Sequence, residues 1–182
     1  RDAAQAGDDI WVSGTLGDAR LALAGYRHEL ADQLAMDAER HALAATRMHR
    51  PTPRVTLGLA LRGIARAAID ISDGLVGDLG HILKRSGVGA TLAVDSLPAG
   101  PVLSQQTQAI RRHFTLAGGD DYELCFTAPA DRRDAVLAAG QAAATAVTRI
   151  GSIDAGRGLR LCDADNAPLT LQLASFDHFL ST

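Results

Sequence analysis

Two carboxylates three residues apart mark the first segment that could carry chemistry, residues 68–75, which read AIDISDGL. An apolar strand is expected to deliver Asp70 and Asp73, with the hydroxyl of Ser72 between them, to the start of a helix. Carboxylate oxygens at the end of a strand suit Mg²⁺, and the N–H groups at a helix N-terminus suit a phosphate. The simpler interpretation is structural, with Ser72 or Asp73 capping the helix and Asp70 in a turn. This segment alone leaves both interpretations open.

A second acidic segment, residues 117–126, reads AGGDDYELCF. A strand from Tyr122 to Thr127 would place alternate side chains, beginning with Tyr122, against the core. Asp121 and Glu123 would then lie side by side on the opposite face. Their mutual repulsion would be relieved by a cation or a positively charged substrate. The alternative is an ordinary solvated strand face.

Three arginines, Arg47, Arg50 and Arg54, flank a turn that contains two prolines. They could contact a phosphate, or they could lie in solvent around the turn. The sequence contains no GxxxxGK[ST], GxGxxG, HExxH or GxSxG motif, and its six histidines do not have the spacing of zinc ligands. A P-loop nucleotide site is therefore excluded.

The elements that must position these residues alternate between strand and helix, which predicts an α/β layered domain. Strands are expected at residues 9–13, 67–70, 90–94, 122–127 and 148–153, with a closing hairpin at 159–162 and 169–173. Helices are expected over about 15 residues from 18, and at 37–48, 55–66, 72–85, 104–112 and 131–145. Both acidic segments then follow or begin strands.

The composition fits one well-buried domain, with 182 residues, 47% of them hydrophobic, and a net charge of −3. This balance argues against nucleic acid or a membrane surface as the main partner. No apolar run approaches the roughly 18 residues that a membrane span needs. The two cysteines, Cys125 and Cys162, form no CxxC pair, so we expect free thiols and a reduced, cytoplasmic setting.

Taken together, several segments resemble the thiamine-monophosphate kinase family. They are GDDI (7–10), VSGTLG (12–17), RPTPRV (50–55), AAIDISDGL (67–75), LAGGDDYEL (116–124) and FDHF (176–179). They occur in the family's order and cover nearly the whole chain. The DxSDGL element is shared across the wider superfamily of aminoimidazole ribonucleotide synthetase and selenophosphate synthetase, whereas the GGDDYEL element is more specific.

The resemblance implies a mixed β-sheet covered by helices, like the C-terminal domain of that superfamily. It also implies transfer of the γ-phosphoryl group of ATP to thiamine monophosphate, giving thiamine diphosphate in the cytoplasm. The residues carried over are Asp70 and Asp73 for Mg²⁺, Ser72 for the ATP phosphates, and Glu123, Asp121 and Phe176 for thiamine monophosphate. No side chain is expected to act as an acid or base, because phosphoryl transfer depends mainly on positioning and charge neutralisation.

The sequence departs from the family in one large respect. Family members carry an N-terminal ATP- and metal-binding domain before this one, and they form a homodimer. We therefore expect residues 1–182 to be a single C-terminal domain, largely inactive alone, with an apolar face around Ile10-Trp11-Val12 and the first helix left exposed. Two alternatives remain: another ATP-dependent enzyme of the superfamily, or a non-catalytic binding or assembly module.

Overall fold

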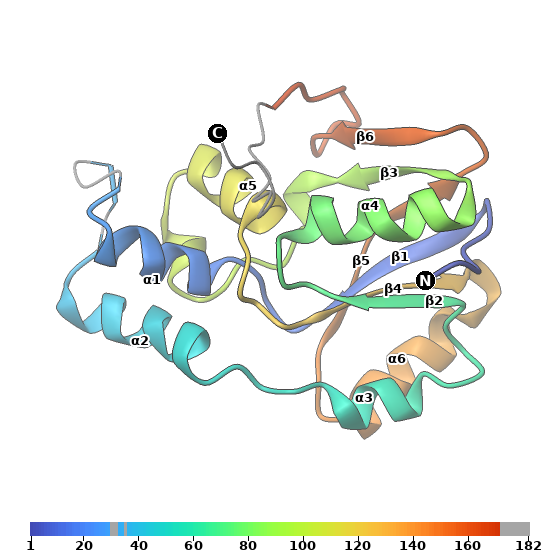
Figure 1. Ribbon diagram of the computed structural model, residues 1–182, viewed down its shortest axis with the longest axis horizontal. Helices are drawn as coiled ribbons and strands as arrows, with labels where there is room; N and C mark the ends of the chain where they lie inside the picture. The colour runs from blue at the N-terminus through green and yellow to red at the C-terminus, as the bar shows by residue number, and fades with distance from the viewer. Residues whose placement is uncertain (30–32, 35, 172–182) are drawn as a thin grey trace, which may run out of the picture.

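A six-stranded mixed sheet, in the order β2-β4-β1-β5-β3-β6, forms the centre of the molecule (Figure 1). The computed structural model describes residues 1–29, 33–34 and 36–171. Neighbouring strands are antiparallel except β3 and β6, which are parallel. The strands are β1 (Asp8–Ser13), β2 (Ala67–Asp70), β3 (Gly89–Ala93), β4 (Leu124–Pro129), β5 (Val147–Asp154) and β6 (Gly158–Cys162). The predicted α/β fold is confirmed.

Helices lie on both faces of this sheet and beyond one end of it (Figure 1). They are α1 (Asp18–Tyr26), α2 (Ala38–His49), α3 (Val55–Ala60), α4 (Leu75–Ser86), α5 (Gln108–Ala117) and α6 (Arg133–Ala142). Short 3₁₀ turns lie at η1 (Val94–Ser96), η2 (Leu103–Gln105) and η3 (Ala130–Arg132). Within the described ranges, no helix has the length and apolar character needed to cross a bilayer.

The alternation of side chains along β1 divides the core into two layers. Ile10 and Val12 pack in the cluster that contains Leu79 of α4. Trp11 faces the opposite way, into the cluster formed with α3 and α6, where its ring stacks on that of Phe126 with 6.5 Å between centroids. A third cluster joins α1, α2, η2 and α5 beyond one end of the sheet (Figure 1).

The expectation that Ile10-Trp11-Val12 and the first helix form an exposed apolar face is wrong. Ile10 and Val12 are 0% exposed and Trp11 is 4% exposed, because β1 lies between β4 and β5. The apolar residues Leu21, Ala22 and Ala24 of α1 are buried in the third cluster.

Several predicted boundaries also differ from the structure. The first helix ends at Tyr26 and α3 ends at Ala60, so both are shorter than expected. The helix predicted at 104–112 begins at Gln108, because the Thr107 side chain accepts a hydrogen bond from the Ile110 amide and caps it there. The helix predicted at 131–145 is a 3₁₀ turn followed by α6, which ends at Ala142.

β6 pairs in parallel with β3 on one side, and the chain then turns back along its other side, so the predicted closing hairpin is present in part. The connection from β5 to β6 crosses the end of β3 at Gly89, where a Cβ atom would lie 2.0 Å from the carbonyl oxygen of Gly156. The returning segment forms a bridge between Cys162 and Pro168, and the amides of Asp163 and Leu169 donate to the carbonyls of Ala167 and Leu161. The last two residues of the predicted return strand lie outside the described residues.

Candidate active site

The turn formed by residues 70–74 is organised by a carboxylate that lies beyond it. Asp78, in the first turn of α4, is 3% exposed. Its Oδ2 accepts hydrogen bonds from the amides of Ser72 at 2.9 Å and Asp73 at 3.0 Å. The N-cap position is Gly74, with φ 105° and no side-chain cap, so the interpretation in which Ser72 or Asp73 caps the helix is wrong.

Asp70 and Asp73 both reach the surface from this turn. The Asp70 side chain is 52% exposed and lies 3.8 Å from Nη2 of Arg1, and Asp73 is also exposed. Burial raises the pKa of Asp78, and the negative charges of Asp73 and Asp70 raise it further. The turn therefore concentrates negative charge that a divalent cation would neutralise.

The donor set suits Mg²⁺ in type but is incomplete in number. Asp70 and Asp73 offer the hard oxygen atoms that Mg²⁺ prefers. Nowhere in the described part of the chain do three or more His, Cys, Asp or Glu side chains gather in an arrangement able to hold a metal ion. By themselves, the two carboxylates would therefore supply only part of the ligand set of such an ion.

Backbone hydrogen bonds join this turn to residues 118–123, which we call the acidic loop. The amide of Asp120 donates to the carbonyl of Ser72 at 3.0 Å, and the amide of Tyr122 donates to the carbonyl of Ile71 at 2.8 Å. A Cβ atom on Gly119 would lie 2.6 Å from the Ser72 oxygen, so this approach requires glycine. Two acidic segments far apart in sequence therefore meet at one edge of the sheet.

The acidic loop has a backbone that the strand prediction did not anticipate. Asp120 and Tyr122 have φ values of 65° and 51°, in the left-handed region that is unfavourable for residues other than glycine. β4 begins only at Leu124, and Tyr122 is 41% exposed instead of facing the core. Such strained positions often accompany functional sites.

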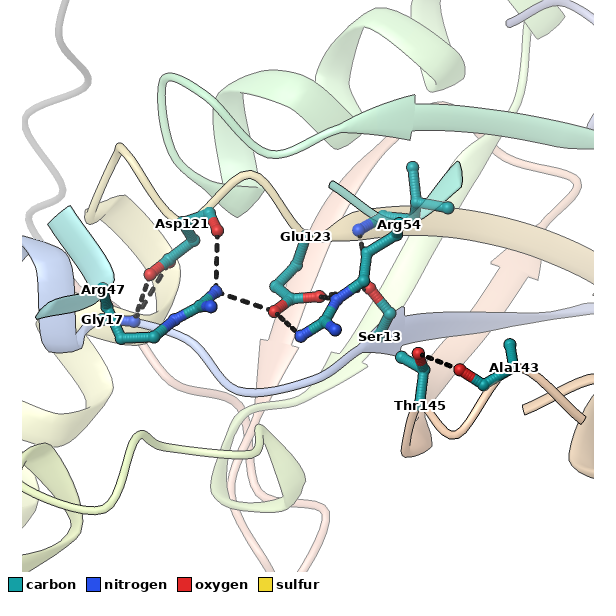
Figure 2. Close-up of polar contacts among 9 residues, drawn as sticks. Ser13, Gly17, Arg47, Arg54, Asp121, Glu123, Ala143 and Thr145 are labelled. Atoms are coloured by element: carbon teal, nitrogen blue, oxygen red, sulfur yellow. Dashed lines mark hydrogen bonds and ion pairs between the residues drawn. The ribbon is translucent and has the colours of Figure 1, made fainter. Parts of the chain in front are cut away.

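Asp121 and Glu123 are both buried, at 1% and 0% exposure, instead of lining an open acidic face. The Glu123 carboxylate accepts hydrogen bonds from Ser13 Oγ at 2.6 Å and Arg47 Nη2 at 2.8 Å. Arg54 donates to it twice, from Nε at 2.7 Å and from Nη2 at 2.6 Å. Figure 2 shows these four residues, Ser13, Arg47, Arg54 and Glu123, converging; we call them the Glu123 cluster.

The Glu123 cluster corrects two interpretations of the sequence. Arg47 and Arg54 are 20% and 17% exposed and reach inward, so they do not simply surround a solvated turn. The charge of Glu123 is balanced by two guanidinium groups, so this carboxylate does not call for a cation. With two positive charges against one negative, the cluster has a surplus that favours an anionic group.

Asp121 fastens the acidic loop to the start of α1. Both of its carboxylate oxygens accept from the Gly17 amide, at 2.8 and 3.0 Å (Figure 2). Burial raises the pKa of Asp121 well above its usual range, although the Gly17 hydrogen bond and the Arg47 charge act in the opposite direction. Through these hydrogen bonds, Asp121 holds the acidic loop in position against the start of α1.

Sequence reasoning missed three residues that shape the site. Asp78 and Ser13 were not singled out, and Arg20 lines a cavity beside the 70–74 turn. Asp78 lies in the first turn of α4 but in the second turn of the helix predicted from residue 72, so its position along the chain provided no signal. The predicted substrate contact Phe176 lies outside the described residues.

The chain is similar in sequence and in structure to known thiamine-monophosphate kinases. Thiamine-monophosphate kinase from Salmonella typhimurium is 43% identical over 98% of this chain and 54% of that protein. The crystal structure of thiamine-monophosphate kinase from Stenotrophomonas maltophilia K279a is 49% identical, with a TM-score of 0.79 over 88% of this chain and 51% of that one. A structure described as AaThiL complexed with AMPPCP and TMP is 30% identical, with a TM-score of 0.74 over 98% of this chain and 53% of that one.

The resemblance inferred from sequence motifs is confirmed by these matches, and the chain spans about half the length of the relatives. The family model for AIR synthase related protein, C-terminal domain, matches residues 5–163. That match includes the 70–74 turn and the acidic loop. This chain belongs to the family of AIR synthase related protein C-terminal domains.

Proposed function

We propose that the chain is the C-terminal domain of a thiamine-monophosphate kinase, which transfers the γ-phosphoryl group of ATP to thiamine monophosphate in the cytoplasm. The observation that carries this proposal is the backbone junction between the 70–74 turn and the acidic loop. It brings the DxSDGL element of the superfamily against the GGDDYEL element, which is more specific to the kinase. The similarity to AaThiL complexed with AMPPCP and TMP supports it.

In this proposal the 70–74 turn binds the metal and the nucleotide phosphates. Asp70 and Asp73 would hold Mg²⁺ through their exposed carboxylates, while Asp78 fixes the turn and Ser72 contacts the phosphates of ATP. Bound Mg²⁺ would supply neutralisation of the charge on the transferring phosphoryl group. The chain's own contribution is to hold the oxygens in place before the substrates arrive.

The acidic loop would form part of the site for thiamine monophosphate. Glu123 would contact the substrate from within its pair of arginines, and Asp121 would hold the loop on α1. The positive surplus of the Glu123 cluster suits the phosphate of the substrate. Phe176 would supply an aromatic contact.

An N-terminal domain and a second copy of the protein complete the proposal. The relatives are about twice as long as this chain, which supports a further domain that provides the remaining metal ligands and much of the ATP site. The complete protein would form a homodimer. We expect residues 1–182 alone to bind substrates weakly and to show little kinase activity.

The test is isothermal titration of the chain with thiamine monophosphate and with AMPPCP, with and without Mg²⁺. Asp73→Asn should weaken Mg²⁺-dependent AMPPCP binding by about tenfold or more, because it removes one charged metal ligand. Asp165→Asn, which removes an exposed carboxylate in a distant turn, is the matched control and should leave binding unchanged.

Addition of the N-terminal domain in trans then separates an enzyme from a binding module. Turnover of thiamine monophosphate that appears on mixing supports the kinase. Binding without turnover under those conditions would favour the non-catalytic alternative. Mg²⁺-independent binding of AMPPCP that is equal in wild type and Asp73→Asn would contradict the assigned metal ligands.

A further inference from the structure

A cavity of about 230 Å³ lies between α1 and the junction of the two acidic segments. Its wall includes Arg20 and Arg27 from α1 and the residue after it, together with Ser72, Asp73 and Asp120. Positive side chains thus face the residues assigned to metal and phosphate binding. A cavity with this lining suits a polar, charged ligand.

Arg20 is held firmly but its hydrogen-bonding capacity is not filled. Its Nη2 donates to Glu29 at 2.5 Å, and its guanidinium lies 4.9 Å from the centroid of the Phe114 ring. The loop packs closely on its stem, since a Cβ atom on Gly118 would lie 2.9 Å from Arg20 Cβ. Its Nη1 is buried and has no hydrogen-bond partner among the described residues.

A buried guanidinium nitrogen without an acceptor is costly, and such groups are rare unless a ligand completes them. The Glu29 pair accounts for Nη2, and the guanidinium carbon lies over the Phe114 ring, whereas Nη1 has no acceptor among the described residues. Arginine presents its N–H groups as a rigid fork that matches phosphate oxygens. An anionic oxygen in the cavity would lie beside the Arg20 guanidinium group, which forms part of its wall.

We propose that Arg20 binds a phosphate oxygen of a substrate in this cavity, beside Ser72 and Asp73. The inference rests on the proposed function, because a phosphate is expected here only if this edge of the sheet binds phosphorylated substrates. The phosphate belongs either to the nucleotide or to thiamine monophosphate. Arg27, which is 52% exposed, adds positive charge at the rim.

The experiment measures binding of three probes to the purified chain by isothermal titration: inorganic pyrophosphate with Mg²⁺, thiamine monophosphate, and unphosphorylated thiamine. Arg20→Met should weaken binding of a phosphate probe by about 10- to 100-fold, the usual loss for a charged hydrogen bond. Dependence on Arg20 for pyrophosphate alone assigns the nucleotide phosphate. Dependence for thiamine monophosphate, absent for thiamine, assigns the phosphate of the acceptor.

Two control variants separate phosphate binding from a structural role of Arg20. Glu29→Gln breaks the ion pair but keeps the arginine, so it should bind the phosphate probes at least as well as wild type. Arg85→Met removes an exposed arginine near the end of α4 and should change affinity by less than about twofold. If Arg20→Met does not fold, Arg20→Lys keeps the charge without the fork and should still weaken binding several-fold.

The outcomes distinguish this inference from the proposed function. Unchanged phosphate binding in the Arg20 variants, an equal loss in Glu29→Gln, or no phosphate binding by the wild-type chain would each overturn the inference. Pyrophosphate binding that depends on Arg20, without any binding of thiamine monophosphate, would support the phosphate site and remove the proposed acceptor.

Discussion

Replacing Glu123 with glutamine should destabilise the protein strongly, whatever its effect on substrate binding. Glu123 is 0% exposed, and four donors from Ser13, Arg47 and Arg54 converge on its carboxylate. Removing one partner of a buried ion pair costs about 3–5 kcal/mol, because the remaining charge is left without compensation. We therefore expect Glu123→Gln to lower the free energy of unfolding by about 3 kcal/mol or more.

The assay is equilibrium unfolding in urea. The free energies of unfolding are compared between variants that have the same m-value, which is the slope of that free energy against urea concentration. Arg54→Met alone should cost about 2–3 kcal/mol, since it removes two hydrogen bonds to a charged group. The double variant should cost at least about 1 kcal/mol less than the sum, because the second change removes a partner that is already lost. Arg62→Met, which alters an exposed arginine just after α3, should stay within about 0.5 kcal/mol of wild type.

Additive effects of the two changes, or a Glu123→Gln variant as stable as wild type, would refute this account of the Glu123 cluster. The prediction also affects how binding experiments are read. Loss of thiamine monophosphate binding in a Glu123 variant indicates a substrate contact only if the variant remains folded at the assay temperature. Ser13→Ala, which removes one hydrogen bond and no charge, is the milder comparison.

Three further changes test other parts of the site and fold. Burial raises the pKa of Asp121, so the folded state keeps a proton that the unfolded chain releases above about pH 4. The stability that Asp121 contributes should then fall as pH rises from about 4 toward its folded pKa, so the free energy of unfolding of Asp121→Asn should rise relative to that of wild type over that range in urea unfolding. Gly119→Ala should push the two acidic segments apart, lower the free energy of unfolding by about 1–3 kcal/mol and abolish binding of AMPPCP. Gly77→Ala is the control: it lies in α4 with open space around an added Cβ atom, so it should raise the free energy of unfolding by up to about 1 kcal/mol. Ala144 follows α6 with φ 48°, so Ala144→Gly should raise stability by about 1 kcal/mol, or the melting temperature by about 2–4 °C.

The local sequence pattern was sufficient to predict the strands in which buried side chains recur at regular spacing. The strand at residues 67–70 was predicted at its observed bounds, and the alternation of β1 explains its two buried faces. The placement of Asp70 and Asp73 at the end of a strand followed from the same reasoning. Each of these features depends on residues that lie close together in the sequence.

Contacts between distant residues lay beyond the sequence pattern. Glu123 meets Arg47 and Arg54 across separations of 76 and 69 residues, and no local spacing relates them. Tyr122 has a left-handed backbone, against the preference of a tyrosine for extended structure, and its amide donates to the Ile71 carbonyl. Asp121 and Glu123 are buried, where a regular strand would have presented them to solvent.

The two acidic segments differ in how far their carboxylates are exposed. Asp70 and Asp73 are exposed at the surface, whereas Asp121 and Glu123 are buried and matched to an amide and two arginines. A cation entering this edge of the sheet would therefore meet its strongest attraction at the 70–74 turn. The arginines leave a positive surplus beside the acidic loop, and such a surplus would attract a phosphate. If the chain binds thiamine monophosphate as proposed, these residues would recognise its phosphate more than its cationic ring, so a neutral-ring phosphate analogue should compete better than unphosphorylated thiamine.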